Sequence, residues 1–207
     1  NAMYQSSAQL TQFIAADRSI NTLQTYDGPP TDGLKVLSNE CHKIKGHQHF
    51  PDQTHIDPGP FWDWERYYLL INTLPKPQAN YQSQTDTIYD SGGATNNYQN
   101  EERKVWRISP TDAKTVTLTF KTFDIEKDWD FLWIYDGPDN TGALIGKYSG
   151  NTLPGVITAY SGKMCLEFRS DCATTKSGWM AVYNASYSDA ACPAPNNLAV
   201  TNLYPFV

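Results

Sequence analysis

Charged side chains are scarce in this sequence, and basic ones are the scarcer kind. Lysine and arginine number 16 against 22 aspartate and glutamate residues, and the formal net charge is −6. No cluster of basic residues stands out, so neither a nucleic acid nor an anionic membrane surface is an expected partner. The longest uncharged apolar runs, such as residues 67–71, are far shorter than the roughly 18 residues that a membrane-spanning helix needs. We therefore expect no membrane span.

Cysteine is also sparse, with four residues in the chain. Cys165 and Cys172 flank the strand-like run 166–169, whose extended length holds them too far apart to bond to each other. Cys192 is therefore the expected partner of one of them. Aromatic residues, in contrast, are abundant, with 13 tyrosines and 6 tryptophans, which favours a β-rich protein outside the cytoplasm.

The first third of the chain has helical periodicity in two places. Leu10, Phe13 and Ile14 predict a short amphipathic helix over residues 6–16, and the aromatic pattern of residues 61–72 predicts a second helix. Residues 41–47 have the composition of a short strand. Proline-rich residues 74–80 break the second helix and indicate a linker.

Beyond the linker the pattern changes to strands. Residues 115–120 and 164–168 alternate apolar and polar side chains, and residues 131–135 are all β-formers. Short strands separated by Gly, Asp and Asn predict a β-sandwich. We divide the chain into an N-terminal part (4–74), a linker (75–84), a sandwich (85–187) and a tail (188–207) that leads toward a fibronectin III-like module.

Carboxylates of the second half follow the pattern of the CUB domain family. The matching motifs are Phe123-Asp124-Ile125-Glu126, Trp129-Asp130, Tyr135-Asp136-Gly137 and Ser170-Asp171, with Tyr98 eight residues before Trp106. This resemblance implies a jelly-roll β-sandwich that binds calcium through Glu126, Asp130 and Asp171. It also implies that Tyr98 forms a hydrogen bond with a ligand carboxylate. Converging oxygen ligands suit a hard cation. The loop between Glu126 and Asp130 is shorter than in animal members, and Val105 stands where a cysteine often precedes the tryptophan.

All four histidines fall within fourteen residues of the first half, which suggests a metal site. The spacing from Gly46-His47 to the Asp57-Pro58-Gly59-Pro60 motif resembles the closing segment of the zinc-dependent type 2 N-acetylmuramoyl-L-alanine amidases. This resemblance implies that His47 and Asp57 are zinc ligands and that His55 stabilises the oxyanion of the attacked amide. His42 and His49 match nothing in that family. The first zinc ligand of the family and its catalytic base have no counterpart, so we expect an incomplete zinc site.

The sequence thus predicts a mainly β protein, in which a partial α/β amidase segment precedes a CUB-like sandwich. Its parent would be a secreted, periplasmic or cell-surface bacterial peptidoglycan hydrolase that cleaves the amide between N-acetylmuramic acid and L-alanine. We expect this chain alone to be inactive, and its incomplete amidase segment to be able to form a homodimer. The alternative is a non-catalytic, calcium-dependent module that binds a protein or a glycan.

Overall fold

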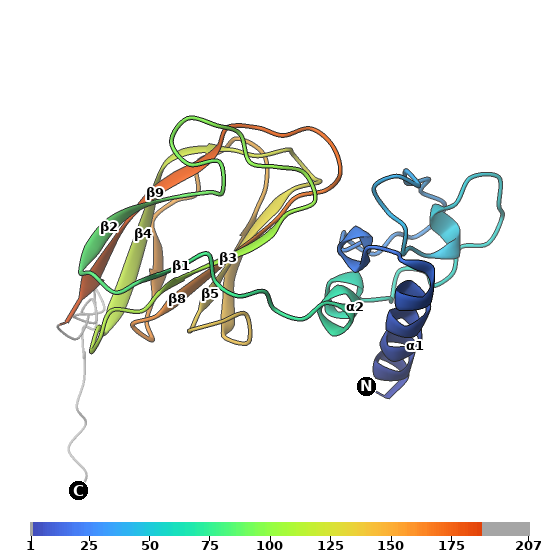
Figure 1. The fold of residues 1–207 in the computed structure, drawn as a ribbon, viewed down its shortest axis with the longest axis horizontal. Helices are drawn as coiled ribbons and strands as arrows, with labels where there is room; N and C mark the ends of the chain where they lie inside the picture. The colour runs from blue at the N-terminus through green and yellow to red at the C-terminus, as the bar shows by residue number, and fades with distance from the viewer. Residues whose placement is uncertain (1, 188–207) are drawn as a thin grey trace, which may run out of the picture.

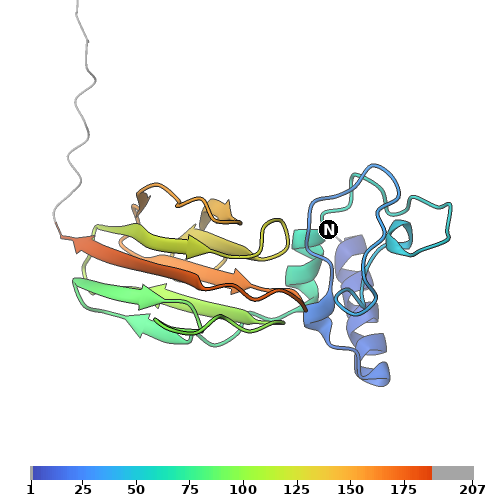
Figure 2. The same ribbon diagram turned by 90° about the horizontal axis from the view of Figure 1, so that it is seen from above.

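The computed structural model describes residues 2–187 and has two parts. The N-terminal segment, residues 2–74, consists of helices and loops, and residues 79–186 form a two-layered β-sandwich (Figure 1). Figure 2 shows the N-terminal segment against one end of the sandwich, while the last strand ends at the opposite end. No helix in the described range is long and apolar enough to cross a membrane. The predicted tail 188–207, which contains Cys192, lies outside the described residues.

Two helices organise the N-terminal segment, α1 (Ala2–Arg18) and α2 (Trp64–Ile71). Asp63 caps α2, because its side chain accepts a hydrogen bond of 2.9 Å from the backbone N–H of Arg66. The helices contact each other through hydroxyl groups, and those of Ser7 and Thr11 lie 2.9 and 2.7 Å from the hydroxyl of Tyr67. The core of the segment consists of Ala8, Tyr26, Leu37, Trp64, Tyr67 and Ile71.

Both predicted helices are present, with shifted ends. The first extends beyond the predicted residues 6–16 in both directions. The second was predicted from residue 61 but begins at Trp64, because Phe61 and Trp62 lie in the turn that leads to the Asp63 cap. Helix ends depend on caps more than on periodicity, so this difference is of the expected kind.

The strand predicted over residues 41–47 is wrong. Here the described chain forms only an isolated bridge between Thr25 and Ile44. A short 3-10 helix, η2 (His47–His49), begins at the end of this stretch, and another, η1 (Thr22–Gln24), directly precedes Thr25. A strand needs a neighbour along its whole length to pair its backbone groups, and the neighbouring loop provides one at a single residue. The predicted α/β character of this segment is therefore absent from its described residues.

Two sheets form the sandwich. In the five-stranded sheet the order is β1 (Ala79–Tyr81), β3 (Arg103–Ile108), β8 (Met164–Arg169), β5 (Phe131–Asp136) and β6 (Ala143–Tyr148). In the four-stranded sheet the order is β2 (Thr85–Tyr89), β9 (Gly178–Ser186), β4 (Thr115–Asp124) and β7 (Ile157–Ala159). All pairings are antiparallel except β1 with β3. The strands predicted over residues 115–120, 131–135 and 164–168 are confirmed.

The main core lies between the two sheets. It includes Leu118 and Phe120 of β4, Leu166 and Phe168 of β8, and Trp179 of β9, all of which are buried. These residues alternate along their strands, as a sandwich requires. The alternation in residues 115–120 and 164–168 therefore reports the inward face of each strand correctly.

The outer face of the central strands β3, β8 and β5 is largely buried as well. All six residues of β8 are buried, and Val105, Trp133, Tyr135 and Cys165 form a second apolar cluster on this outer face. Residues around α2 cover it, because Leu74 packs on the cluster and the carbonyl of Thr73 accepts a hydrogen bond from Arg103. The N-terminal segment is thus part of the hydrophobic structure of the sandwich.

The sandwich begins inside the stretch 75–84, which the sequence predicts to be a linker. β1 pairs in parallel with β3, with Ala79 opposite Trp106. The backbone N–H of Gln78 also donates a 2.6 Å hydrogen bond to the carbonyl of Val105. The edge of β3 offers backbone groups with which this polar sequence can pair. This tertiary contact overrides its weak local β-propensity.

One disulfide joins the two parts of the described chain, between Cys41 and Cys172, which are separated by 131 residues. The expectation that Cys192 would pair with one of Cys165 and Cys172 is wrong for Cys172. Cys165 is a free thiol buried on the outer face of β8, and burial raises its pKa to about 12. Cys172 lies beyond the end of β8, where the N-terminal segment docks, and this position explains why its partner comes from the first half of the chain.

Candidate metal sites

Three carboxylates meet at the end of the sandwich that faces the N-terminal segment. Glu126 and Asp130 belong to the loop between β4 and β5, and Asp171 follows β8. One oxygen from each lies within 4.8 Å of the others. Calcium binds oxygens at about 2.3–2.6 Å, so two ligands on opposite sides of one ion lie about 5 Å apart. The spacing of this triad therefore matches a single shared calcium ion.

Hydrogen bonds hold the buried member of the triad in place. The hydroxyl of Tyr98 donates to Oδ2 of Asp130 at 2.5 Å, and the backbone N–H of Asp171 donates to Oδ1 at 2.8 Å. The same tyrosine hydroxyl accepts a 3.0 Å hydrogen bond from the backbone N–H of Glu126. Tyr98 and Asp130 are both 0% exposed. Tyr98 thus connects two ligand residues and fixes the orientation of the central carboxylate.

The triad is electrostatically unfavourable without a cation. Burial raises the pKa of Asp130 to about 7, and the charges of Asp171 and Glu126 act in the same direction. Burial also raises the pKa values of Glu126 and Asp171. The Oε2 atom of Glu126 is buried and has no hydrogen-bond partner in the described chain. A bound cation would satisfy this oxygen and offset the mutual repulsion, so the residues fit calcium.

A second cluster lies in the N-terminal segment. His47, His55 and Asp57 are exposed, and one potential ligand atom of each lies within 4.8 Å of the others. The Nδ1 atoms of His47 and His55 are 3.5 and 4.0 Å from Oδ1 of Asp57, and the two imidazole rings stack with centroids 4.8 Å apart. The fold thus brings together the three residues that the amidase resemblance singles out. Imidazole and carboxylate together suit zinc.

The other two histidines are structural. His49 is fully buried, and its Nδ1 accepts a hydrogen bond from the backbone N–H of Gly46 at 3.2 Å. Burial lowers the pKa values of His42 and His49 to about 4, so both are neutral at physiological pH. His42 lies toward the calcium-type triad, with its ring centroid 5.9 Å from that of Trp129.

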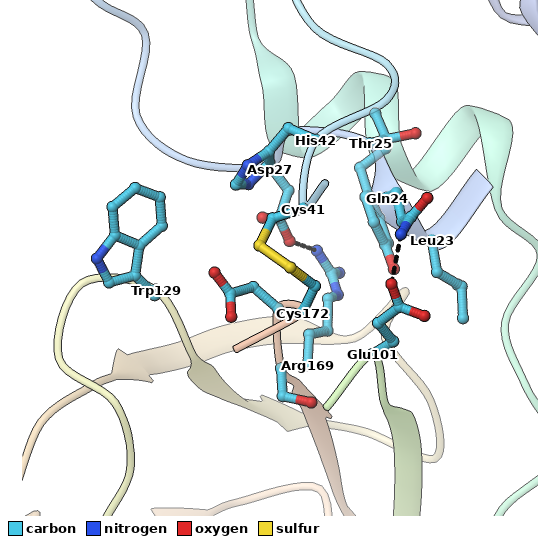
Figure 3. A pocket seen from close by; sticks show the side chains of 13 residues that line it. Leu23, Gln24, Thr25, Asp27, Cys41, His42, Glu101, Trp129, Arg169 and Cys172 are labelled. Carbon is cyan, nitrogen blue, oxygen red and sulfur yellow. Dashed lines mark hydrogen bonds and ion pairs between the residues drawn. A yellow bond between two sulfur atoms is a disulfide. The ribbon is translucent and has the colours of Figure 1, made fainter. Parts of the chain in front are cut away.

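Sequence reasoning missed a buried charge network between the two parts. Glu167 accepts hydrogen bonds of 2.8 Å from the Nε atoms of both Arg103 and Arg169. Burial alone would raise the pKa of Glu167, but the two guanidinium groups more than offset this and lower it. Arg169 also forms a 3.0 Å ion pair with Asp27 of the N-terminal segment (Figure 3). The sequence signal for this network is the pair of opposite charges, Glu167 and Arg169, in a strand whose other four residues are apolar.

Comparison with known proteins identifies the sandwich. The family model for the CUB domain matches residues 78–183. "Procollagen C-endopeptidase enhancer 2" of Mus musculus is 35% identical over 103 residues, which cover 48% of this chain and 25% of that protein. "Tolloid-like protein 1" of Homo sapiens is 33% identical over 99 residues, which cover 46% of this chain and 10% of that protein. This chain therefore spans a quarter or less of the length of these two relatives.

The solved structures that are similar to this chain include a CUB domain. The MASP-1 CUB2 domain bound to Ca2+ is 26% identical and has a TM-score of 0.47, with 53% of this chain and all of that chain covered. The family match itself extends over half of the 207 residues and over both sheets, from the residue before β1 to β9. This chain belongs to the CUB domain family.

Proposed function

We propose that this chain is a non-catalytic, calcium-binding interaction module of a secreted protein, which recognises a protein or glycan ligand. The observation that carries the proposal is the convergence of Glu126, Asp130 and Asp171, together with the unpartnered buried oxygen of Glu126. A buried carboxylate oxygen without a hydrogen-bond partner costs free energy that a bound cation would recover. Membership of the CUB family supports the assignment to a binding module.

The roles of the individual residues follow from their positions. Asp130, which is fully buried and held by two hydrogen bonds, is the central ligand. Glu126 and Asp171 are partly exposed and supply oxygens from two different loops. Bound calcium would supply the positive charge that offsets the repulsion between the carboxylates of these two loops. Tyr98 is a positioning residue, because it contacts a ligand carboxylate and the backbone of a second ligand.

Secretion is supported by the disulfide between Cys41 and Cys172. Disulfides persist in oxidising environments outside the cytoplasm, where calcium is also available to weakly binding modules. A protein located in a reducing compartment would not keep this bond.

A calcium titration of the full chain tests the proposal. We expect isothermal titration calorimetry to detect one site, and calcium to raise the melting temperature. Asp130→Asn should abolish both effects. Asp128→Asn is the matched control, because it removes the same charge from an exposed side chain in the same loop, at a backbone φ of 65° that asparagine tolerates. Absence of a calcium effect in the unsubstituted chain would refute the proposal.

A second candidate function rests on the convergence of His47, His55 and Asp57. We propose that these residues bind zinc as a remnant or a fragment of a bacterial amidase site. Catalytic zinc normally has three protein ligands and an open position, which this cluster could provide. Zinc titration of His47→Ala should show weaker binding, whereas Asp52→Asn should not, because Asp52 is an exposed acid in the same loop with a φ of 56°.

A bound zinc ion would not by itself make this chain a catalyst. In the amidase scheme a positioned acidic residue or tyrosine activates the zinc-bound water, and the resemblance supplies none here. Loss of a general base costs about 10²–10⁴-fold in rate. We therefore propose that the zinc-loaded chain does not hydrolyse muramoyl-peptides. Zinc-dependent release of L-alanine-terminated peptides would contradict this.

We also propose that the N-terminal segment associates with a second copy of the chain through the exposed side of α1. Trp64, Tyr67 and Tyr68 are buried within the chain and are unavailable to a second copy. α1 instead exposes Met3, Leu10, Phe13 and Ile14. Sedimentation equilibrium of the full chain, compared with a Leu10→Gln and Ile14→Gln double variant, would show whether this face forms a homodimer.

A further inference from the structure

The calcium-type triad lies beside the junction between the N-terminal segment and the sandwich. The side-chain contacts that join the two parts there include the ion pair of Asp27 with Arg169, the hydrogen bond from Gln24 to Glu101, and the Cys41–Cys172 disulfide. Figure 3 shows these contacts gathered in one small region, with Trp129 and His42 beside them. The junction is therefore fixed by covalent, ionic and hydrogen bonds within a few residues of the triad.

One short loop belongs to both the triad and the junction. We call residues 170–173 the Asp171 loop. In it, Asp171 supplies a triad carboxylate and the next residue, Cys172, supplies a sulfur of the disulfide. Hydrogen bonds to two backbone carbonyls hold the loop: the carbonyl of Asp171 accepts from the backbone N–H of Glu101 at 2.6 Å, and that of Cys172 accepts from the side chain of Asn100 at 2.9 Å.

A direct hydrogen bond links the position of the loop to the buried ligand. The backbone N–H of Asp171 donates to Oδ1 of Asp130 at 2.8 Å. A hollow of about 180 Å3 lies at this point and is lined by triad residues Glu126 and Asp171 and by junction residues Cys41 and His42. The N-terminal segment therefore forms one wall of the space beside the triad. Movement of the loop away from Asp130 would alter the triad and the disulfide together.

We propose that calcium binding and docking of the N-terminal segment are coupled through the Asp171 loop, which stays closed over its disulfide when Glu126, Asp130 and Asp171 share a cation. The inference rests on the calcium binding proposed above and extends it to regulation. When the carboxylates repel one another, the loop opens more often, and the Cys41–Cys172 bond becomes more accessible to an attacking thiolate. Coupling between two sites is reciprocal, so an intact disulfide also strengthens calcium binding.

Reduction of the Cys41–Cys172 disulfide needs a reductant. Dithiothreitol supplies it in the test: its first thiolate attacks one sulfur of the Cys41–Cys172 bond and displaces the other as a thiolate, which takes up a proton. Its second thiol then displaces the remaining protein sulfur as a thiol. The products are two cysteine thiols and cyclic oxidised dithiothreitol, with two electrons transferred.

The first experiment measures the rate of this reduction in the full chain. Samples with excess calcium or with a calcium chelator are treated with dithiothreitol, quenched with iodoacetamide and analysed by mass spectrometry for alkylated Cys41 and Cys172. We expect calcium to slow the reaction by at least about fivefold, which corresponds to a coupling free energy at the lower end of the range of about 1–3 kcal/mol. The effect should vanish in Asp130→Asn and persist in Asp128→Asn. A calcium effect that survives Asp130→Asn would overturn the proposal.

The reciprocal experiment measures calcium affinity before and after reduction of the unsubstituted chain, so no variant has to fold without its disulfide. The dissociation constant should rise on reduction by the same factor by which calcium changes the reduction equilibrium. If calcium binds but neither quantity changes, the coupling is wrong and the proposed calcium site stands. If calcium does not bind at all, the proposed function itself fails.

Discussion

The hydroxyl of Tyr98 lies 2.5 Å from Oδ2 of Asp130, and neither residue is exposed to solvent. Tyr98 comes from the long loop before β3, whereas Asp130 immediately precedes β5. A hydrogen bond to a buried carboxylate is of the strong, charge-assisted kind when that carboxylate is ionised. This pair therefore determines how the carboxylate at the centre of the triad is oriented.

Tyr98→Phe tests the positioning role of the tyrosine. The change leaves Asp130 with one donor fewer and should cost about 1–3 kcal/mol of unfolding free energy in urea, together with a weaker calcium affinity. Tyr183→Phe is the matched control, because this buried tyrosine bonds to Ser83, near the other end of the sandwich. It should lose stability and keep its calcium affinity. Equal losses of affinity in both variants would exclude a specific role for Tyr98.

The pH dependence of stability should report the ionisation of Asp130. Its pKa in the folded chain is about 7, above the value of about 3.9 for an unfolded chain. The contribution of a raised pKa is fully present below about pH 4 and is lost as the pH rises through about 7. In chelator the chain should thus lose stability across this range, and calcium should restore it at neutral pH.

Urea midpoints at about pH 5 and about pH 7.5, with and without calcium, would measure this effect. Asp130→Asn carries no charge at either pH and should remove this part of the dependence. If the substituted and unsubstituted chains lose stability equally between the two pH values, the raised pKa of Asp130 is not the cause.

Glu167→Gln should destabilise the junction strongly. The substitution leaves Arg103 and Arg169 without the carboxylate that both contact, and breaking a buried ion pair by removing one partner costs about 3–5 kcal/mol. The control is Asp17→Asn, which breaks an ion pair with Arg18 between two largely exposed side chains. Its urea midpoint should be unchanged. A small effect of Glu167→Gln would show that the network contributes little to stability.

Gly46→Ala should displace the side chains of His47, His55 and Asp57 from one another without altering any of these three residues. An added Cβ would lie 2.5 Å from Cδ of Pro58 and 3.1 Å from Cζ2 of Trp64, so the loops that carry the cluster must shift. We expect weaker zinc binding and unchanged calcium binding by calorimetry. Gly155→Ala, where nothing lies within 4 Å of the added atom, should leave both unchanged. Unaltered zinc affinity in Gly46→Ala would contradict the clustered geometry.

Much of the sandwich could be predicted from local sequence. Alternation in residues 115–120 and 164–168 identified two strands, and the aromatic and acidic motifs around Asp130 identified the CUB family. Both signals are local, because strand periodicity and family motifs are formed by residues close together in the chain. The same motifs predicted Glu126, Asp130 and Asp171 as ligands, and the fold brings these three residues to one end of the sandwich.

The tertiary structure alone decided how the two parts of the chain meet. Cys41 and Cys172 are separated by 131 residues, and no local pattern relates them. β1 forms in a polar, proline-flanked stretch because β3 offers it an open edge. The outer face of β8, which carries Cys165, Glu167 and Arg169, becomes a buried layer only because the N-terminal segment covers it. Each of these features depends on which surfaces come into contact, and contact between distant segments is set by packing and not by the propensities of either segment.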